Sequence, residues 1–216
     1  MSVCKAYEKE LLRLRHWLHR HPELSMEEHL TTQFIYDYLN ALEIPCYKTG
    51  DTGVIATLML NPAYKTIAIR SEIDGLPIQE ATGLPFSSLY PGKMHACGHD
   101  ATTAVTLCLA KVLAEHKEVL ACNVRFLFEP GEETGQGAKH LIAHGALENP
   151  KVDAILVFHF GNQEIRHMEI QKSITTAAVG GITLHVTGKS SHWFQPQDGI
   201  DALYAASPDW QWKSIG

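Results

Sequence analysis

The chain has 216 residues, and its 24 acidic and 18 basic side chains leave a formal net charge of −6. An apolar fraction of 45% is typical of a folded globular protein and excludes disordered and collagen-like chains. The mild acidity argues against nucleic acid or an anionic membrane as a partner, and no apolar run approaches the roughly 20 residues that span a bilayer.

Two helices are predicted at the amino end. Apolar residues recur at helical spacing over residues 3–20, and Pro22 is expected to end this helix because proline disfavours helical geometry in the residue before it. Ser25 followed by Glu28 resembles a capping box, which predicts a second helix from there to about residue 42. The amino end is charged throughout and lacks the apolar core of a secretory signal.

Strands and helices then alternate along the chain, which predicts an α/β sandwich with a mostly parallel sheet. Short apolar runs of strand length are separated by segments with helical periodicity. The expected strands cover residues 54–60, 66–70, 124–128 and 152–160, and the expected helices cover residues 100–115 and 138–147.

The pattern changes beyond residue 165. Residues 181–188 alternate apolar and polar side chains, which predicts a half-exposed strand of an antiparallel sheet. A helix is expected over residues 198–206, whereas residues 207–216 show no periodicity. A second domain is therefore expected to begin near residue 175 and to be unfinished.

Polar residues follow several of the expected strands at their carboxyl ends. In open α/β sheets the ligand crevice lies outside this edge, so these side chains should converge there. Thiol, imidazole and carboxylate groups together indicate a metal site. The residues concerned are Glu72, Asp74, His95, Cys97, His99, Asp100, Glu129, Glu132, Glu133 and His159.

Two short motifs carry most of this interpretation. Cys97 and His99, one residue apart, can place sulfur and nitrogen on one cation, and Asp100 at a helix N-cap could orient an imidazole. Glu132 and Glu133 could simply complement a helix dipole, but at a metal site one can bind the cation while the other transfers a proton.

The histidines divide into two groups. His159 ends an apolar run in line with the other rim residues, and His192 is either a loop residue or a donor to an oxyanion. The remaining histidines on helices or loops are assigned to surface or capping positions: His16, His19, His21, His29, His116, His140, His144 and His167.

Five separated motifs resemble those of the metallopeptidase M20 superfamily, above all its branch of hippurate hydrolases, N-acyl-amino-acid deacylases and auxin-conjugate hydrolases. They are LHRHPELSMEE, RSEIDGLPIQE, MHACGHDATTA, FEPGEETGQGAKHLI and VFHF, in this order along the chain. The resemblance implies a three-layer sandwich similar to zinc exopeptidases over residues 1–175, in incomplete form. Residues 176–216 would begin a smaller α+β lid or dimerisation domain.

The resemblance also implies a chemistry. Such enzymes use two divalent metal ions to cleave the amide bond of N-acetyl, N-benzoyl or similar amino acids. A thiolate ligand favours Zn²⁺, and Mn²⁺, Co²⁺ or Ni²⁺ would also suit the donors. Full-length relatives are expected to be homo-oligomers. By analogy, the metal ligands are Cys97, His99, Glu133 and His159, the general base is Glu132, the substrate-contacting histidine of the small domain is His192, and the supporting acid is Asp74.

The chain also departs from the family pattern. Thr102 stands where relatives have a histidine, and Glu72 replaces an aspartate. The residues around His192, Ser190-Ser191 and residues 193–197, differ from the usual motif. Family members are much longer, so the chain resembles the first half of such an enzyme, with an unpaired sheet edge and little or no activity expected of it alone.

Three alternatives remain open at this point. The same metals could serve a dipeptidase or aminopeptidase acting on free peptides. The chain could instead be an inactive folded remnant. A cysteine hydrolase built on Cys97 is disfavoured, because neighbouring acids would raise the pKa of its thiol in the absence of metal. The five scattered cysteines are too few for a disulfide framework and favour a reducing, cytoplasmic location.

Overall fold

A computed structural model describes residues 2–161, 169–170 and 183–206 of the chain. The chain divides into two compact units, Met1–Gln163 and Glu164–Gly216. The domain boundary expected near residues 175 and 176 lies outside the described residues. No helix of the described part is both long enough and apolar enough to cross a membrane.

The first unit is built on a five-stranded mixed sheet with the order β1-β2-β4-β3-β5. β3 pairs in parallel with β4 and β5, whereas β2 pairs antiparallel with both β1 and β4. The predicted α/β class is confirmed, and β1 is a strand that the sequence pattern did not predict. The strands are β1 (Cys46–Lys48), β2 (Val54–Leu58), β3 (Thr66–Glu72), β4 (Asn123–Glu129) and β5 (Ala154–Val157).

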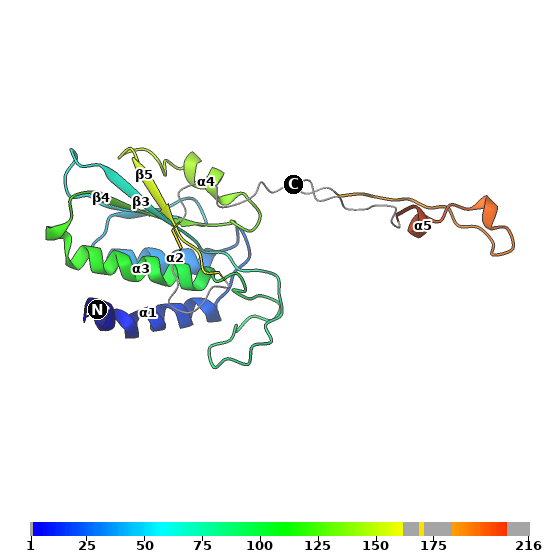
Figure 1. Ribbon diagram of the computed structural model, residues 1–216, viewed down its shortest axis with the longest axis horizontal. Helices are drawn as coiled ribbons and strands as arrows, with labels where there is room; N and C mark the ends of the chain where they lie inside the picture. Colours follow the sequence, from blue (N-terminus) through cyan, green and yellow to red (C-terminus); the bar gives the residue numbers. More distant parts are fainter. Residues whose placement is uncertain (1, 162–168, 171–182, 207–216) are drawn as a thin grey trace. The chain divides into compact units, whose positions relative to one another are not determined.

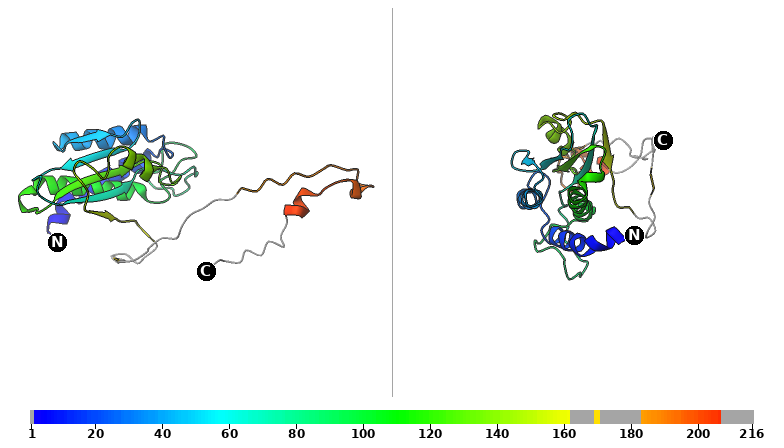
Figure 2. Two further views of the ribbon diagram at one scale, coloured as in Figure 1. Left: turned by 90° about the horizontal axis from the view of Figure 1, so that it is seen from above. Right: turned by 90° about the vertical axis from the view of Figure 1, so that its left-hand side faces the viewer.

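Helices cover both faces of the sheet and produce three layers. α2 (His29–Ala41) and α3 (His99–Glu115) pack on one face, with α1 (Ser2–Arg20) on the outer side of α3, and α4 (Gly137–Ala143) packs on the other face. Figures 1 and 2 show α3 between α1 and the sheet. The larger core joins these helices to the sheet through fully buried residues such as Leu14, Ile35, Leu107, Phe126 and Phe128.

The central strands carry the candidate site at their carboxyl ends. β3 and β4 are parallel, and their register places Glu72 directly beside Glu129. Beyond the strand ends, the backbone N–H of Ile73 donates to the carbonyl of Glu129. α3 begins at His99, and the side chain of His99 contacts Asp74, so the start of this helix lies close to the same edge. The parallel arrangement of β3 and β4 therefore brings together the polar residues that follow each strand.

The last strand of the first unit is apolar but exposed. β5 pairs with β3 on one side, and the part of the chain that the structure describes supplies no strand for its other side. Leu156 and Val157 are 58% and 59% exposed. The strand expected over residues 152–160 is shorter in the structure and covers four residues, and the unpaired sheet edge stays a prediction.

The predicted capping box at Ser25 and Glu28 is wrong. α2 begins at His29, and its N-cap residue Glu28 makes no side-chain cap hydrogen bond. The carboxylate of Glu23 takes this role instead, accepting from the backbone N–H groups of Leu30 and Thr31 at 3.0 and 2.8 Å. The capping box does not form because Ser25 donates to Asp74 and Glu28 accepts from Gly131.

The predicted strand over residues 181–188 is also wrong for the residues of this range that the structure describes. Residues 183–188, the described part of that range, form no strand. A single β-bridge links Lys189 to Ile200, which is too little hydrogen bonding to hold an extended segment as a ladder. The helix expected over residues 198–206 is shorter, at α5 (Ala202–Ala206), and follows a single 3₁₀ turn at Pro196–Asp198.

A buried arginine joins the sheet to the segment after α4. The guanidinium of Arg125, on β4, donates to the carbonyl oxygens of Glu148 at 2.6 Å, Gly145 at 3.0 Å and Pro150 at 3.3 Å. It also donates to the hydroxyl of Tyr47 at 3.1 Å, and Arg125 is only 2% exposed. One buried guanidinium therefore serves three carbonyl oxygens of the segment after α4.

Replacing Arg125 by methionine should lower the free energy of unfolding by about 2–4 kcal/mol, because the hydrogen bonds of a buried guanidinium to three carbonyl groups are lost. Urea denaturation followed by circular dichroism measures this loss. Tyr47→Phe is the control: it removes one of the arginine's acceptors and should cost less than about 1 kcal/mol. An Arg125→Met variant as stable as the parent would contradict this account.

Candidate metal centre

The loop before α3 places a thiol and an imidazole at the carboxyl edge of the sheet. Gly98, the N-cap of α3, has φ +96°, a left-handed conformation that glycine adopts without steric cost. Cys97 and His99 flank this glycine. The prediction of Asp100 as N-cap is wrong, because Gly98 is the N-cap and Asp100 lies within the first turn of α3.

His99 is held in one orientation by Asp74. Its Nδ1 lies 2.9 Å from the backbone oxygen and 3.1 Å from Oδ1 of Asp74. Both partners are acceptors, so Nδ1 carries a proton, which leaves Nε2 as the nitrogen that a cation can bind. Nε2 is buried and has no hydrogen-bond partner among the residues that the structure describes. A buried imidazole nitrogen of this kind, backed by a carboxylate on the other nitrogen, is the usual arrangement of a metal-ligating histidine.

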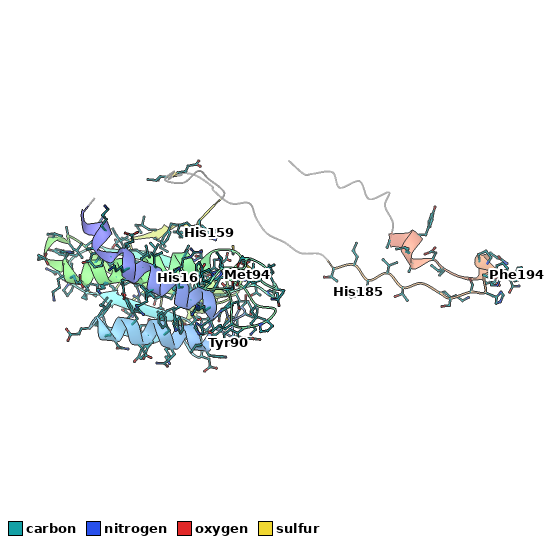
Figure 3. The ribbon with its side chains drawn as sticks, turned by 90° about the horizontal axis from the view of Figure 1, so that it is seen from below. His16, Tyr90, Met94, His159, His185 and Phe194 are labelled. Atoms are coloured by element: carbon teal, nitrogen blue, oxygen red, sulfur yellow. The ribbon has the colours of Figure 1, made fainter. Side chains whose placement is uncertain are left out.

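The other predicted ligands surround this nitrogen. Donor atoms of Cys97, His99 and His159 all lie within 4.8 Å of one another, and Cys97 Sγ is 3.5 Å from His159 Nε2. His99 Nε2 lies 3.8 Å from a carboxylate oxygen of Glu132 and 4.0 Å from one of Glu133. Figure 3 labels His159, which follows β5. Residues up to 62 positions apart in the sequence therefore meet at one point.

The two glutamates sit on the loop after β4. Glu133 donates its backbone N–H to Asp74 Oδ2 at 3.0 Å, and Ser25 donates its hydroxyl to the same oxygen at 2.7 Å. Burial would raise the pKa of Asp74, but the hydrogen bonds from His99 and Ser25 lower it, so Asp74 is ionised. Burial raises the pKa of Glu132, which suits a group that accepts and returns a proton.

The thiol of Cys97 is a poor nucleophile in this setting. Burial, together with the negative charge of Glu133, raises the pKa of Cys97 to about 12. The expectation that neighbouring acids raise this pKa is thus confirmed, and the thiol is protonated at neutral pH. A bound cation would reverse this balance, because it stabilises the thiolate directly.

The donor set fits a divalent metal ion. It combines one sulfur, two imidazole nitrogens and carboxylate oxygens, and the lone pair of His99 Nε2 has no other partner. A second group of donors, from Asp74, His99 and Glu132, also lies within 4.8 Å. These contacts bring together six of the seven predicted site residues.

The seventh predicted site residue, His192, lies in the second unit. It is exposed, and its ring stacks on that of Phe194, labelled in Figure 3, with 5.7 Å between the ring centroids. The backbone N–H of Phe194 donates to His192 Nδ1 at 3.3 Å. The role of His192 as an oxyanion donor stays a prediction.

The two departures from the family pattern near the sheet edge contact each other. Thr102, in the position of a family histidine, donates its hydroxyl to Glu72 Oε2 at 3.4 Å. Glu72 and Thr102 are both buried. Glu72, which is longer than an aspartate, thus reaches Thr102, which is smaller than a histidine.

Sequence reasoning missed Arg70. Its Nε donates to Glu129 Oε2 at 2.7 Å, and its Nη1 donates to Glu72. Arg70 thus neutralises two acids that lie side by side at the ends of β3 and β4. The available signal was a basic residue inside an otherwise apolar strand, two positions before an acid.

The assignment of His19 to the surface is wrong. His19 is 3% exposed, and its Nδ1 lies 2.8 Å from Asp100 Oδ2 while its Nε2 lies 3.3 Å from Glu80 Oε1. Arg15 also contacts Asp100, at 3.2 Å. Two carboxylate acceptors require both ring nitrogens to carry protons, so His19 is an imidazolium that joins α1 to the first turn of α3. The imidazole that Asp100 orients is therefore that of His19.

A cavity of about 570 Å³ adjoins the thiol side of this centre. Its walls combine apolar side chains with the charged side chains of Arg15, His19 and Asp100. They include Leu11, Leu84, Met94, Cys97, Ala101, Val105 and Phe160. This cavity is large enough for an acyl group or a small side chain.

His19 should make stability depend on pH. The hydrogen bond to Asp100 raises the pKa of His19 above its ordinary 6.5. The stabilisation is fully present below that ordinary pKa and is lost as pH rises through the folded-state pKa. The free energy of unfolding should therefore fall between about pH 6 and about pH 9 by more in the parent than in His19→Gln.

Chemical denaturation at a series of pH values measures this difference. His16→Gln is the matched control, because His16 lies on the same helix and its ring stacks on Phe86 with 4.0 Å between the ring centroids. The control should keep the pH dependence of the parent. Equal pH dependence in the parent and in His19→Gln would contradict the assignment of an imidazolium.

Comparisons with known proteins identify relatives of the chain. The chain is 39% identical over 202 residues to N-acetyl-L-cysteine deacetylase of Bacillus subtilis, covering 93% of this chain and 48% of that protein. It is 38% identical over 197 residues to IAA-amino acid hydrolase ILR1-like 5 of Arabidopsis thaliana, covering 90% and 44%. The chain thus spans about half the length of these relatives.

A solved structure and a family model show to which family the chain belongs. A dinuclear metal-binding peptidase of the M20 family from Bacillus subtilis matches with a TM-score of 0.68 and 42% identity, covering 72% of this chain and 44% of that one. The family model described as peptidase family M20/M25/M40 matches residues 68–207. The chain therefore belongs to peptidase family M20/M25/M40.

Proposed function

We propose that this chain forms the metal-binding part of an amidohydrolase that cleaves the amide bond of N-acyl amino acids. The observation that carries the proposal is the buried, unpartnered Nε2 of His99, which faces a thiol, a second imidazole and two carboxylates. Relatives named for the deacetylation of N-acetylcysteine and the hydrolysis of IAA-amino acids support this substrate class.

Cys97, His99, Glu133 and His159 would hold the metal ions. The peptidase described as dinuclear supports a pair of divalent ions. A thiolate among the donors favours Zn²⁺, while the carboxylate and imidazole donors also accept Mn²⁺, Co²⁺ or Ni²⁺. When bound, such ions polarise the substrate carbonyl and lower the pKa of a water molecule.

Glu132 would transfer the proton. It is 36% exposed on its side chain and lies 3.8 Å from His99 Nε2, so it can reach both the centre and solvent. Its raised pKa, caused first by burial, brings it nearer to the working pH of a general base. Glu132 would take a proton from the attacking water and return it to the departing amine.

Three further assignments belong to this proposal. His192 would donate to the oxyanion that forms at the substrate carbonyl. Asp74 would keep His99 in the tautomer that presents Nε2. The apolar walls of the cavity beside Cys97 would receive part of the substrate. We further propose a cytoplasmic location and homo-oligomeric full-length relatives, with a small molecule as the substrate.

A second candidate function is a peptidase that acts on free peptides, which the description of the matching solved structure favours. The purified chain, supplied with Zn²⁺ or Mn²⁺, can be assayed on N-acetylcysteine and on a dipeptide of similar size. Faster turnover of the acylated amino acid supports the proposal, and faster turnover of the dipeptide supports the peptidase. Bound metal without turnover of either supports an inactive remnant, and failure to bind metal overturns the metal centre.

The two adjacent glutamates should respond differently to loss of charge. Glu133→Gln removes a ligand and should weaken Zn²⁺ binding by about tenfold or more, measured by isothermal titration calorimetry. Glu132→Gln should leave that affinity nearly unchanged but lower kcat by about 10²–10⁴-fold wherever turnover is measurable. The two variants are matched controls for each other, and equal losses of affinity would contradict the division of roles.

A further inference from the structure

We propose that Glu28 is a positioning residue that holds the loop carrying Glu132 and Glu133 at the metal centre. The proposal rests on the proposed function, because it assigns Glu28 a task in assembling that centre. Glu28 lies at the start of α2, more than 100 positions from the loop. Its motif, LHRHPELSMEE, is otherwise unused by the proposed chemistry.

The side chain of Glu28 contacts the loop directly. Glu28 is 0% exposed, and its Oε1 accepts the backbone N–H of Gly131 at 2.7 Å. Its other oxygen, Oε2, is buried without a hydrogen-bond partner among the described residues. Burying a half-satisfied carboxyl group costs free energy, so stability alone favours an apolar side chain here. Burial also raises the pKa of Glu28 to about 7.

Helix capping does not explain this glutamate. Glu28 makes no side-chain cap hydrogen bond, and Glu23 accepts from the free N–H groups of α2 instead. The carboxyl group of Glu28 therefore does not cap α2, and it contacts the loop through the N–H of Gly131.

The turn that contains Met26 also packs closely against the loop at Gly131. Gly131 has φ +60°, and a Cβ atom at this position would lie 2.6 Å from Sδ of Met26. Met26 itself has φ +65°, which is uncommon for a residue with a side chain. A side chain at Gly131 would therefore have to displace the side chain of Met26, which shows that the loop and this turn are in close contact.

The backbone is held on both sides of Glu132. Glu28 holds the N–H of Gly131, before Glu132. Asp74 Oδ2 holds the N–H of Glu133, after it, and Ser25 donates to that same oxygen. One turn of the chain, Ser25 to Glu28, therefore fixes the loop directly at one amide and through Asp74 at the other. Glu132 lies between the two fixed amides, so its carboxylate is aimed by this clamp.

The experiment compares Glu28→Leu with Asn123→Leu. Asn123 is a matched control because it is also 0% exposed, and its Oδ1 accepts the backbone N–H groups of Leu60 and Asn61 at 2.8 and 3.1 Å. It lies at the opposite end of β4 from the loop. Glu28→Gln keeps an acceptor oxygen, and Ser25→Ala is a milder variant should Glu28→Leu fail to fold.

Zn²⁺ affinity of the folded chain is the first readout. Glu28→Leu should weaken it by about tenfold or more, while Glu28→Gln and Asn123→Leu should stay within about threefold of the parent. Ser25→Ala should weaken it by an intermediate factor. Parent-like affinity in Glu28→Leu, or an equal loss in Asn123→Leu, would overturn the proposal.

Amide hydrogen exchange without metal is the second readout. The amides of Gly131 and Glu133 should exchange faster in Glu28→Leu than in the parent, and Asn123→Leu should leave their rates unchanged. A parent chain that binds no Zn²⁺ would overturn the proposed function. The exchange rates would then decide separately whether Glu28 holds the loop, and unchanged rates in Glu28→Leu would overturn that role.

Discussion

The hydrogen bonds between Asp74 and His99 are the constraint on which the rest of the centre depends. Two oxygens of Asp74 accept the N–H of Nδ1, so the other nitrogen of this buried ring faces the carboxylates and has no hydrogen-bond partner among the described residues. The same carboxylate accepts the amide of Glu133 and the hydroxyl of Ser25. A single acid at the end of β3 therefore orients one imidazole and anchors the loop that faces it.

Much of this arrangement could be predicted because it follows from chain direction. Apolar runs predicted β2, β3 and β4, and parallel strands that end at one edge bring their following residues together. The grouping of Cys97, His99 and His159 was predictable for this reason. β1 was not, because a three-residue strand carries too little pattern to be recognised.

The errors at the helix caps and at His19 share one physical cause, which is the competition of distant partners with local preferences. Ser25 and Glu28 have the spacing of a capping box, yet both bind residues more than 40 positions away. Asp100 has the composition of an N-cap, but a buried imidazolium at His19 takes its carboxylate. Local spacing cannot reveal such contacts, since they depend on which segments the fold brings side by side.

Arg70 favours the correct register between β3 and β4. Its guanidinium bridges Glu129 and Glu72, two acids that face each other across neighbouring parallel strands. A shift of one residue between β3 and β4 would turn side chains to opposite faces and leave like charges buried without a counterion. Misaligned pairings are thus penalised at the edge where the ligands converge, and correct strand pairing becomes a condition for assembling the reaction centre.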